Sequence, residues 1–219
     1  MNMASELRTR IVSGTLLALI VIALTLVNFW SFAALLIVAF VILMREWLGL
    51  IRTRSYRLAW VGFGILYIGA AIVNLTLIHF IAGPILVLVL LLSVAVMDSA
   101  AYFVGKPFGK HKIAPKISPG KSWEGLFGAW IGVTLVFAGL TFFFHLPVSL
   151  PILLLSALFF TLLGLGGDLF ESWMKRRAGV KDSGRLIPGH GGLFDRVDAL
   201  IPCAILAGYP LMMIFMPAF

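Results

Sequence analysis

Long apolar runs constrain this chain more than any other feature. A span of about 20 apolar residues is the length of a transmembrane helix, and seven segments meet that length: 11–28, 30–48, 58–80, 83–104, 125–145, 148–169 and 193–215. Hydrophobic residues make up 61% of the 219 residues, which is more than one soluble core can bury. The sequence therefore predicts an all-α, polytopic integral membrane protein with about seven transmembrane helices, forming a single domain over residues 1–219.

The connections between these segments predict how they pair. "NFWS" separates the first two spans and "IAGP" the third and fourth, so each pair is expected to form a tight helical hairpin. The N-terminal stretch "MNMASELRTR" is followed by an apolar run without a small-residue cleavage site. It is therefore interpreted as a retained signal anchor.

The basic residues predict the orientation in the membrane. With seven spans, all 17 Lys and Arg residues fall on one side, whereas the alternate connections and the terminal "MPAF" carry no charged side chain. Positive loops face the cytoplasm. The pattern is compatible with a bacterial inner membrane protein whose functional loops face the cytoplasm.

Two of the basic loops differ from loops that only set orientation. The segments at about 105–124 and 170–192 mix Lys and Arg with Gly, Pro and Ser, a composition that brings backbone N–H groups and cations close to an anion. Both are expected to be irregular loops that hold phosphate. Nucleic acid is ranked low as a partner, because the charges are split between two short loops without a recognised binding pattern. "GKS" at 120–122 is not a P-loop, since Pro115 stands where that motif requires Gly.

Four aspartates are expected at one membrane depth, at the cytoplasmic ends of the spans: Asp98, Asp168, Asp195 and Asp198. Asp168 is expected near a helix C-terminus, whose partial negative charge favours a cation. Grouped carboxylates repel one another unless a cation joins them. Oxygen ligands without Cys favour Mg²⁺. The alternative, pairing of Asp195 or Asp198 with Arg185 or Arg196, stays open.

The segment "SWMKRRAGVKDSGRLIPGHGGLFDRVD" (172–198) closely resembles the signature of phosphatidate cytidylyltransferases, also called CDP-diacylglycerol synthases. "DSAAYFVGKPFGKHKIAPKISPGKSWEG" (98–125) resembles the other cytoplasmic loop of that family, and "LRTRIVSG" and "REWLGL" resemble its N-terminal region. This chain departs from the family in being shorter between about residues 52 and 85, and in having Ala100 where Gly is usual.

The resemblance implies a reaction in which phosphatidate attacks the α-phosphorus of CTP, giving CDP-diacylglycerol and pyrophosphate with Mg²⁺. It also implies a homodimer, and it leaves open whether a second cation such as K⁺ is needed. Asp168 and Asp195 are predicted to ligate Mg²⁺, with Asp198 as a further ligand or beside them. The predicted catalytic residues are Asp168, Asp195, Asp198, Lys175 and Arg196.

Further residues are predicted to bind the substrates. Lys175, Arg176, Lys181 and Arg196 would hold the phosphates of CTP or phosphatidate. A loop carrying Ser118, Lys121 and Ser122 would close over them, and His190, Gly191 and Gly192 would allow a tight turn at the metal.

Two other functions remain as alternatives. One is another CTP-using lipid enzyme, either a cytidylyltransferase for a different phospholipid or a polyprenol kinase. The kinase would release CDP, whereas the cytidylyltransferase would release pyrophosphate. The other is a small transporter, but a transporter should place ionisable groups at mid-bilayer, whereas these crowd one interface.

Overall fold

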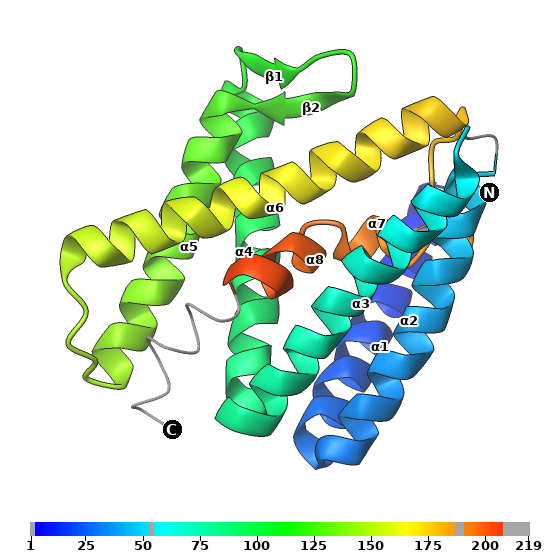
Figure 1. The fold of residues 1–219 in the computed structure, drawn as a ribbon. Helices are drawn as coiled ribbons and strands as arrows, with labels where there is room; N and C mark the ends of the chain where they lie inside the picture. Colours follow the sequence, from blue (N-terminus) through cyan, green and yellow to red (C-terminus); the bar gives the residue numbers. More distant parts are fainter. Residues whose placement is uncertain (1–2, 53–54, 187–190, 208–219) are drawn as a thin grey trace.

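The computed structural model describes residues 3–52, 55–186 and 191–207, with the backbone alone over 3–11 and at 207. Within this part the chain forms six long helices, a β-hairpin and three short helical segments (Figure 1). The long helices are α1 (Met3–Val27), α2 (Phe29–Leu50), α3 (Arg57–Ala82), α4 (Pro84–Phe108), α5 (Trp123–Phe143) and α6 (Leu150–Ala178). The other elements are β1 (Lys112–Ala114), β2 (Ser118–Ser122), α7 (Phe194–Val197), α8 (Leu200–Pro202) and a π-helical turn, η1 (Cys203–Ala207).

The prediction of a helical membrane protein is confirmed. Among the described residues, the five helices α2 to α6 are long and apolar enough to cross a membrane, and α1 contributes a shorter apolar stretch, Val12–Val27. Their outer surfaces are covered with exposed Leu, Ile, Val and Phe side chains, as expected of surfaces that face lipid. The six long helices match the first six predicted segments, whereas the count of seven spans is not confirmed.

Both predicted hairpins are present. Asn28 separates α1 from α2 and caps α2: its side chain accepts a hydrogen bond from the Ser31 amide, and the Ser31 hydroxyl lies within hydrogen-bonding distance of the Asn28 amide in return. Gly83 alone separates α3 from α4, with φ of 83°, a conformation that glycine adopts without steric cost. Pro84 then starts α4, where its missing N–H has no partner to lose.

The predicted seventh span is not one continuous helix. The described part of it, up to residue 207, is broken into α7, α8 and η1, and the remainder lies outside the described residues. Pro202 ends α8 and is followed directly by the wider η1 turn. A proline removes one backbone donor and disturbs the helix around it, which is consistent with the break at this point.

The two predicted phosphate-binding loops are more ordered than expected. The stretch 105–124 contains the end of α4 and the antiparallel β1–β2 hairpin. In the stretch 170–192, α6 continues to Ala178 and ends at Gly179, whose φ is 69°. The expectation that Asp168 lies near a helix C-terminus is therefore wrong, because good helix formers carry α6 ten residues further.

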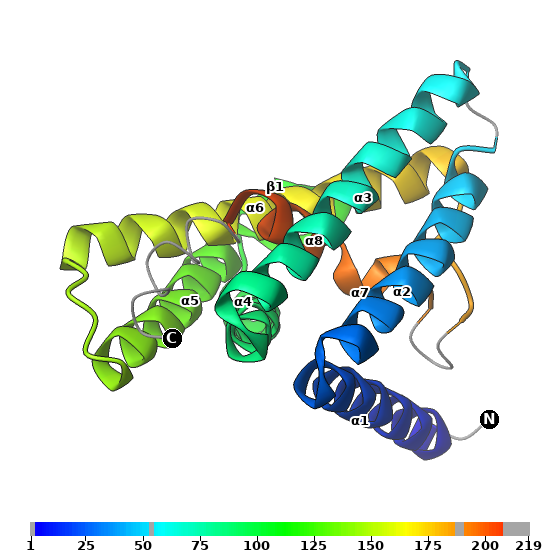
Figure 2. The same ribbon diagram turned by 60° about the horizontal axis from the view of Figure 1, so that its bottom comes forward.

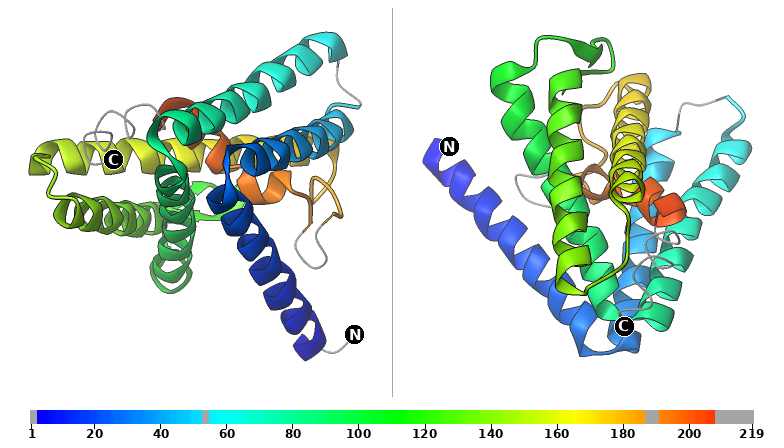
Figure 3. Two further views of the ribbon diagram at one scale, coloured as in Figure 1. Left: turned by 90° about the horizontal axis from the view of Figure 1, so that it is seen from below. Right: turned by 90° about the vertical axis from the view of Figure 1, so that its left-hand side faces the viewer.

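α6 brings distant parts of the chain together. In Figure 1 it runs diagonally across the other long helices, and it contacts α5, α8 and β2 as well as α2. α1 contacts α2 and α4 but diverges from the rest of the molecule toward its N-terminus (Figures 2 and 3). The functional side chains are therefore positioned by α2 to α6 and the segments that pack on α6.

The packing of α6 against the chain after α7 depends on a missing side chain. A Cβ added to Gly167 would overlap the carbonyl oxygen of Asp198 and approach Pro202 Cγ to 2.7 Å. A Cβ at the neighbouring Gly166 would have no atom within 4 Å. Only Gly167 is therefore required for the close approach.

We expect Gly167→Ala to destabilise the protein by about 1–3 kcal/mol, because the obstructing atom is backbone and cannot rotate away. Gly166→Ala is the matched control and should be neutral or slightly stabilising, since alanine favours helix more than glycine does. The measurement is the apparent Tm in detergent at one heating rate. Equal Tm values for the two variants would contradict the packing described here.

Candidate active site

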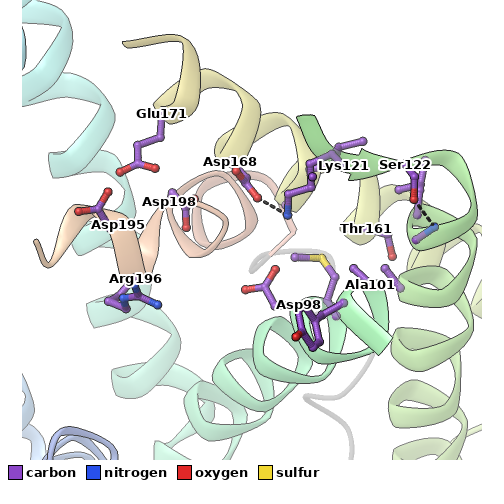
Figure 4. Close-up of a pocket in the computed structure, with 18 of the residues that line it drawn as sticks. Asp98, Ala101, Lys121, Ser122, Thr161, Asp168, Glu171, Asp195, Arg196 and Asp198 are labelled. Carbon is purple, nitrogen blue, oxygen red and sulfur yellow. Dashed lines mark hydrogen bonds and ion pairs between the residues drawn. The ribbon is translucent and has the colours of Figure 1, made fainter. Parts of the chain in front are cut away.

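A cavity of about 460 Å³ lies where α4, α5, α6, the β-hairpin and the α7 segment meet (Figure 4). The α7 segment is α7 together with Asp198, which follows it. This volume is within the range of small-molecule sites. Its lining combines small apolar residues with a concentration of charge. The charged residues that line it are Asp98, Lys121, Asp168, Glu171, Lys175, Asp182, Asp195, Arg196 and Asp198.

Lys121 pairs with one carboxylate and lies within the electrostatic influence of two others. Lys121 forms an ion pair with Asp168, and the charges of Asp98 and Asp198 also act on it. Burial opposes protonation of Lys121, but these three carboxylates outweigh burial and raise its pKa. Burial and the nearby charge of Asp168 raise the pKa of Asp198 above its ordinary value. This part of the cavity therefore has an excess of negative charge and favours cations.

The second charged group is built around Lys175. Its Nζ atom lies 2.6 Å from Glu171 Oε2 and 2.7 Å from Asp195 Oδ1. The other oxygen of Asp195 accepts hydrogen bonds from the amides of Ser183 and Gly192 and from the Ser183 hydroxyl, at 2.8–2.9 Å. Burial opposes ionisation of Asp195, but the hydrogen bonds from Lys175 and the two amides lower its pKa to about 2. Asp195 is thus a fixed anion.

The β-hairpin holds Lys121 in place. At its base the amide of His111 lies 3.2 Å from Glu124 Oε1, and His111 Nδ1 lies 2.7 Å from the same oxygen. Ser122 caps α5, its Oγ accepting a hydrogen bond from the Gly125 amide at 3.1 Å. On its other side the hairpin contacts α6, because Arg176 Nε donates to the Ile117 carbonyl at 3.3 Å.

The structure brings together part of the predicted site. The predicted residues that line the cavity are Asp168, Asp195, Asp198, Lys175, Arg196, Lys121 and Ser122. Those that do not line it are Ser118, Arg176, Lys181, Gly191 and Gly192, and His190 lies outside the described residues. Gly191 has a φ of 85°, and a Cβ there would approach Asp195 Oδ2 to 2.8 Å, in keeping with the tight turn expected at this point. The substrate-binding roles of these residues remain predictions.

Three carboxylates were not among the residues predicted from the sequence: Asp182, which lines the cavity, and Glu171 and Glu46. Glu171 is 1% exposed and lines the cavity. It lies three residues after Asp168 and four before Lys175, so helical spacing along α6 was a signal that could have identified it. Glu46 comes from α2 and receives hydrogen bonds from residues far along the chain. No local pattern in the sequence could have indicated those contacts.

The carboxylates of the cavity can supply part of the coordination shell of a hard cation such as Mg²⁺, but not all of it. Among the described residues no three His, Cys, Asp or Glu side chains are grouped as a complete metal site. Mg²⁺ commonly uses one or two carboxylates and completes its shell with water and phosphate oxygens. Asp168 and Asp198 meet that requirement, and the buried Glu171 Oε1 nearby has no hydrogen-bond partner in the described part of the chain. Both oxygens of Asp195 are already engaged, and so are both oxygens of Asp168, by Lys121 and Ser172. A cation at either carboxylate would therefore replace one of these contacts.

We expect Lys175→Met to cost about 3 kcal/mol of stability, because it leaves two buried carboxylates without their cation. The matched control is Arg177→Met, two residues further on α6. Arg177 is exposed and lies over the Trp173 ring, 4.8 Å from its centroid, so its loss should cost no more than about 1 kcal/mol. Thermal unfolding in detergent compares the two. Similar losses would show that Lys175 does not hold the acidic residues together.

Comparison with known proteins relates these residues to a family. A model of the cytidylyltransferase family matches residues 56–215, which include every residue that lines the cavity. Phosphatidate cytidylyltransferase of Haemophilus influenzae is 37% identical over 182 residues, covering 80% of this chain and 62% of the relative. The enzymes of that name from Mycobacterium leprae and Bacillus subtilis are 44% and 50% identical over 119 and 108 residues.

This chain aligns with less than two thirds of the length of each of these relatives. The chain spans 62% of the Haemophilus protein, 38% of the Mycobacterium protein and 39% of the Bacillus protein. The family model nevertheless covers well over half of this chain and the whole of the cavity. The chain therefore belongs to the cytidylyltransferase family.

Proposed function

We propose that this protein is a phosphatidate cytidylyltransferase, which transfers CMP from CTP to phosphatidate and produces CDP-diacylglycerol and pyrophosphate. The observation that carries the proposal is the charged cavity between the apolar helices α4, α5 and α6, in which Lys121 pairs with Asp168. Membership of the cytidylyltransferase family and the names of its relatives, which are phosphatidate cytidylyltransferases, supply the substrates of the proposal.

The location of the charges suits a reaction between a lipid and a soluble nucleotide. The cavity residues lie in the second halves of α4 and α6, at the start of α5, on the hairpin and on the α7 segment, whereas most of the outward surface of the long helices is apolar. A lipid headgroup can reach such a place from the bilayer, and CTP can reach it from water. We also propose that the cavity faces the cytoplasm of a bacterial inner membrane, following the distribution of basic residues.

In the proposed reaction, a phosphate oxygen of phosphatidate forms a bond to the α-phosphorus of CTP. The bond between this phosphorus and the bridging oxygen breaks, and its electron pair leaves with pyrophosphate. The nucleophile is already an anion, so little general-base catalysis is needed. The main demands are positioning and neutralisation of charge.

The residues of the cavity meet those demands in different ways. We propose that Lys121 exchanges its ion pair with Asp168 for the phosphates of CTP, and that Arg196 also binds phosphate. Asp168 and Asp198 would hold Mg²⁺, which when bound neutralises developing charge on the phosphates. Lys175 would act within the protein, holding Glu171 and Asp195 in place. A homodimer and a second cation remain untested predictions.

The test is phosphatidate-dependent release of pyrophosphate from CTP by the purified protein in detergent with Mg²⁺. Asp168→Asn should lower turnover by about 100-fold or more, because it removes a charge from the cavity without changing the size of the side chain. Arg52→Gln, an exposed change outside the cavity, should leave turnover nearly unchanged.

Two results would overturn the proposal. Release of CDP instead of pyrophosphate would assign the protein to a kinase reaction. Near-normal turnover by Asp168→Asn would show that the cavity is not the site of the chemistry.

A further inference from the structure

Glu46 is a buried carboxylate that does not line the cavity but contacts the segments that build it. It lies one turn before the end of α2 and is 8% exposed. Its Oε1 atom accepts a hydrogen bond from the Leu193 amide at 2.9 Å, and its Oε2 atom accepts one from the Phe194 amide at 2.7 Å. One side chain thus holds two successive amides at the start of α7, about 147 residues away along the chain.

Two glycines, Gly184 and Gly192, leave room for the Glu46 carboxylate. A Cβ at Gly184 would come within 2.5 Å of Glu46 Oε1, and a Cβ at Gly192 within 2.6 Å. A carboxylate buried this deeply is stable only when its oxygens receive hydrogen bonds. The two glycines allow the polar backbone to come close enough to supply them.

Glu46 is linked to Asp195 through one hydroxyl group. The Ser183 Oγ atom lies 2.9 Å from Asp195 Oδ2 and 3.3 Å from Glu46 Oε2. The Gly192 amide donates to Asp195, and the next two amides donate to Glu46. The two carboxylates therefore divide three consecutive amides between them and fix the backbone directly before and at the beginning of α7.

The segment fixed in this way carries charge into the cavity. Asp195 and Arg196 lie in α7 and Asp198 follows it directly, and all three line the cavity. Opposite them, Asp168 and Lys175 are held on α6. The separation between these two sets depends on where α7 is held, and Glu46 ties α7 to α2.

We propose that Glu46 is a positioning residue of the active site, which sets the place of Asp195, Arg196 and Asp198 relative to α6 through the amides of Leu193 and Phe194. This inference rests on the proposed function for its effect on activity, but the contacts themselves do not depend on it. It extends the functional unit to α2, which precedes the region matched by the family model.

The first test uses Glu46→Gln, which keeps the size of the side chain but replaces one acceptor oxygen with an NH₂ group that faces an amide donor. Hydrogen exchange, measured by mass spectrometry without metal or nucleotide, should become faster in peptides that cover 191–198. Exchange in α4 and α5 should stay unchanged. Unchanged exchange over 191–198 would overturn the proposal, whatever reaction the protein catalyses.

The second test is kinetic. In Glu46→Gln we expect kcat to fall and the Mg²⁺ concentration for half-maximal activity to rise, each by about 10-fold or more. Asn28→Ala is the matched control: it removes the cap at the opposite end of the same helix. That change weakens α2 but should leave the Mg²⁺ midpoint unaltered, because a smaller folded fraction lowers the maximal rate alone.

The outcomes separate the two proposals. If wild-type protein makes no CDP-diacylglycerol, the proposed function fails, and hydrogen exchange still decides the role of Glu46. If wild type is active and Glu46→Gln matches Asn28→Ala in its Mg²⁺ midpoint, the positioning role fails. Should Glu46→Gln not insert, Ser183→Ala removes the shared hydroxyl alone and should shift exchange and the Mg²⁺ midpoint in the same directions by smaller amounts. The absence of both shifts would overturn the proposal.

Discussion

Two lysines hold together carboxylates that would otherwise repel one another at the end of an apolar helix bundle. Lys121 pairs with Asp168, and the charges of Asp98 and Asp198 also act on it. Lys175 bridges Glu171 and Asp195. Isolated charges in such a partly desolvated place are costly, and removing one partner leaves the other uncompensated. The arrangement of α4, α6, the hairpin and the α7 segment around the cavity depends on this compensation.

The two lysines differ in how firmly they are held, and this suggests different functions. Lys175 lies on α6 between two carboxylates, and Asp195 is fixed in turn by two amides and a hydroxyl. Lys121 projects from a short hairpin that is tied to the rest of the molecule at His111, Ser122 and Ile117. A cation on a hairpin can exchange a carboxylate for a phosphate with little rearrangement of the helices. Lys121 is accordingly assigned to substrate and Lys175 to the framework.

Much of the fold could be predicted from the sequence, since apolar length and turn residues act locally. The six long helices and the turns at Asn28 and Gly83 follow from these signals. The end of α6 was missed because a basic stretch with Gly and Ser nearby was interpreted as a loop, although its residues are good helix formers up to Gly179. The last apolar segment was expected to be one helix, but Pro202 lies within it.

The site was predictable only where its residues share a motif or a helical face. Lys175, Asp195 and Asp198 stand in the recognisable segment 172–198, Asp168 lies two turns before Lys175 on the same helix, and the structure places all four around one cavity. Glu46 stands in "REWLGL", which resembles the family, but its role could not be inferred from the sequence, because its partners are backbone amides of residues far along the chain. Gly184 and Gly192 are likewise visible in the sequence, but their proximity to the Glu46 carboxylate is a tertiary contact that no local pattern encodes.

The most direct test of the central claim, that the carboxylates of this cavity bind a cation together with the nucleotide, is Mn²⁺ binding measured by electron paramagnetic resonance. Mn²⁺ stands in for Mg²⁺, and purified wild-type protein, Asp198→Asn and Arg52→Gln are each titrated in the presence of CTP. We expect tight, CTP-dependent binding of Mn²⁺ by wild type and Arg52→Gln, and its loss in Asp198→Asn. Undiminished binding by Asp198→Asn would contradict the assignment of the cation to this cavity.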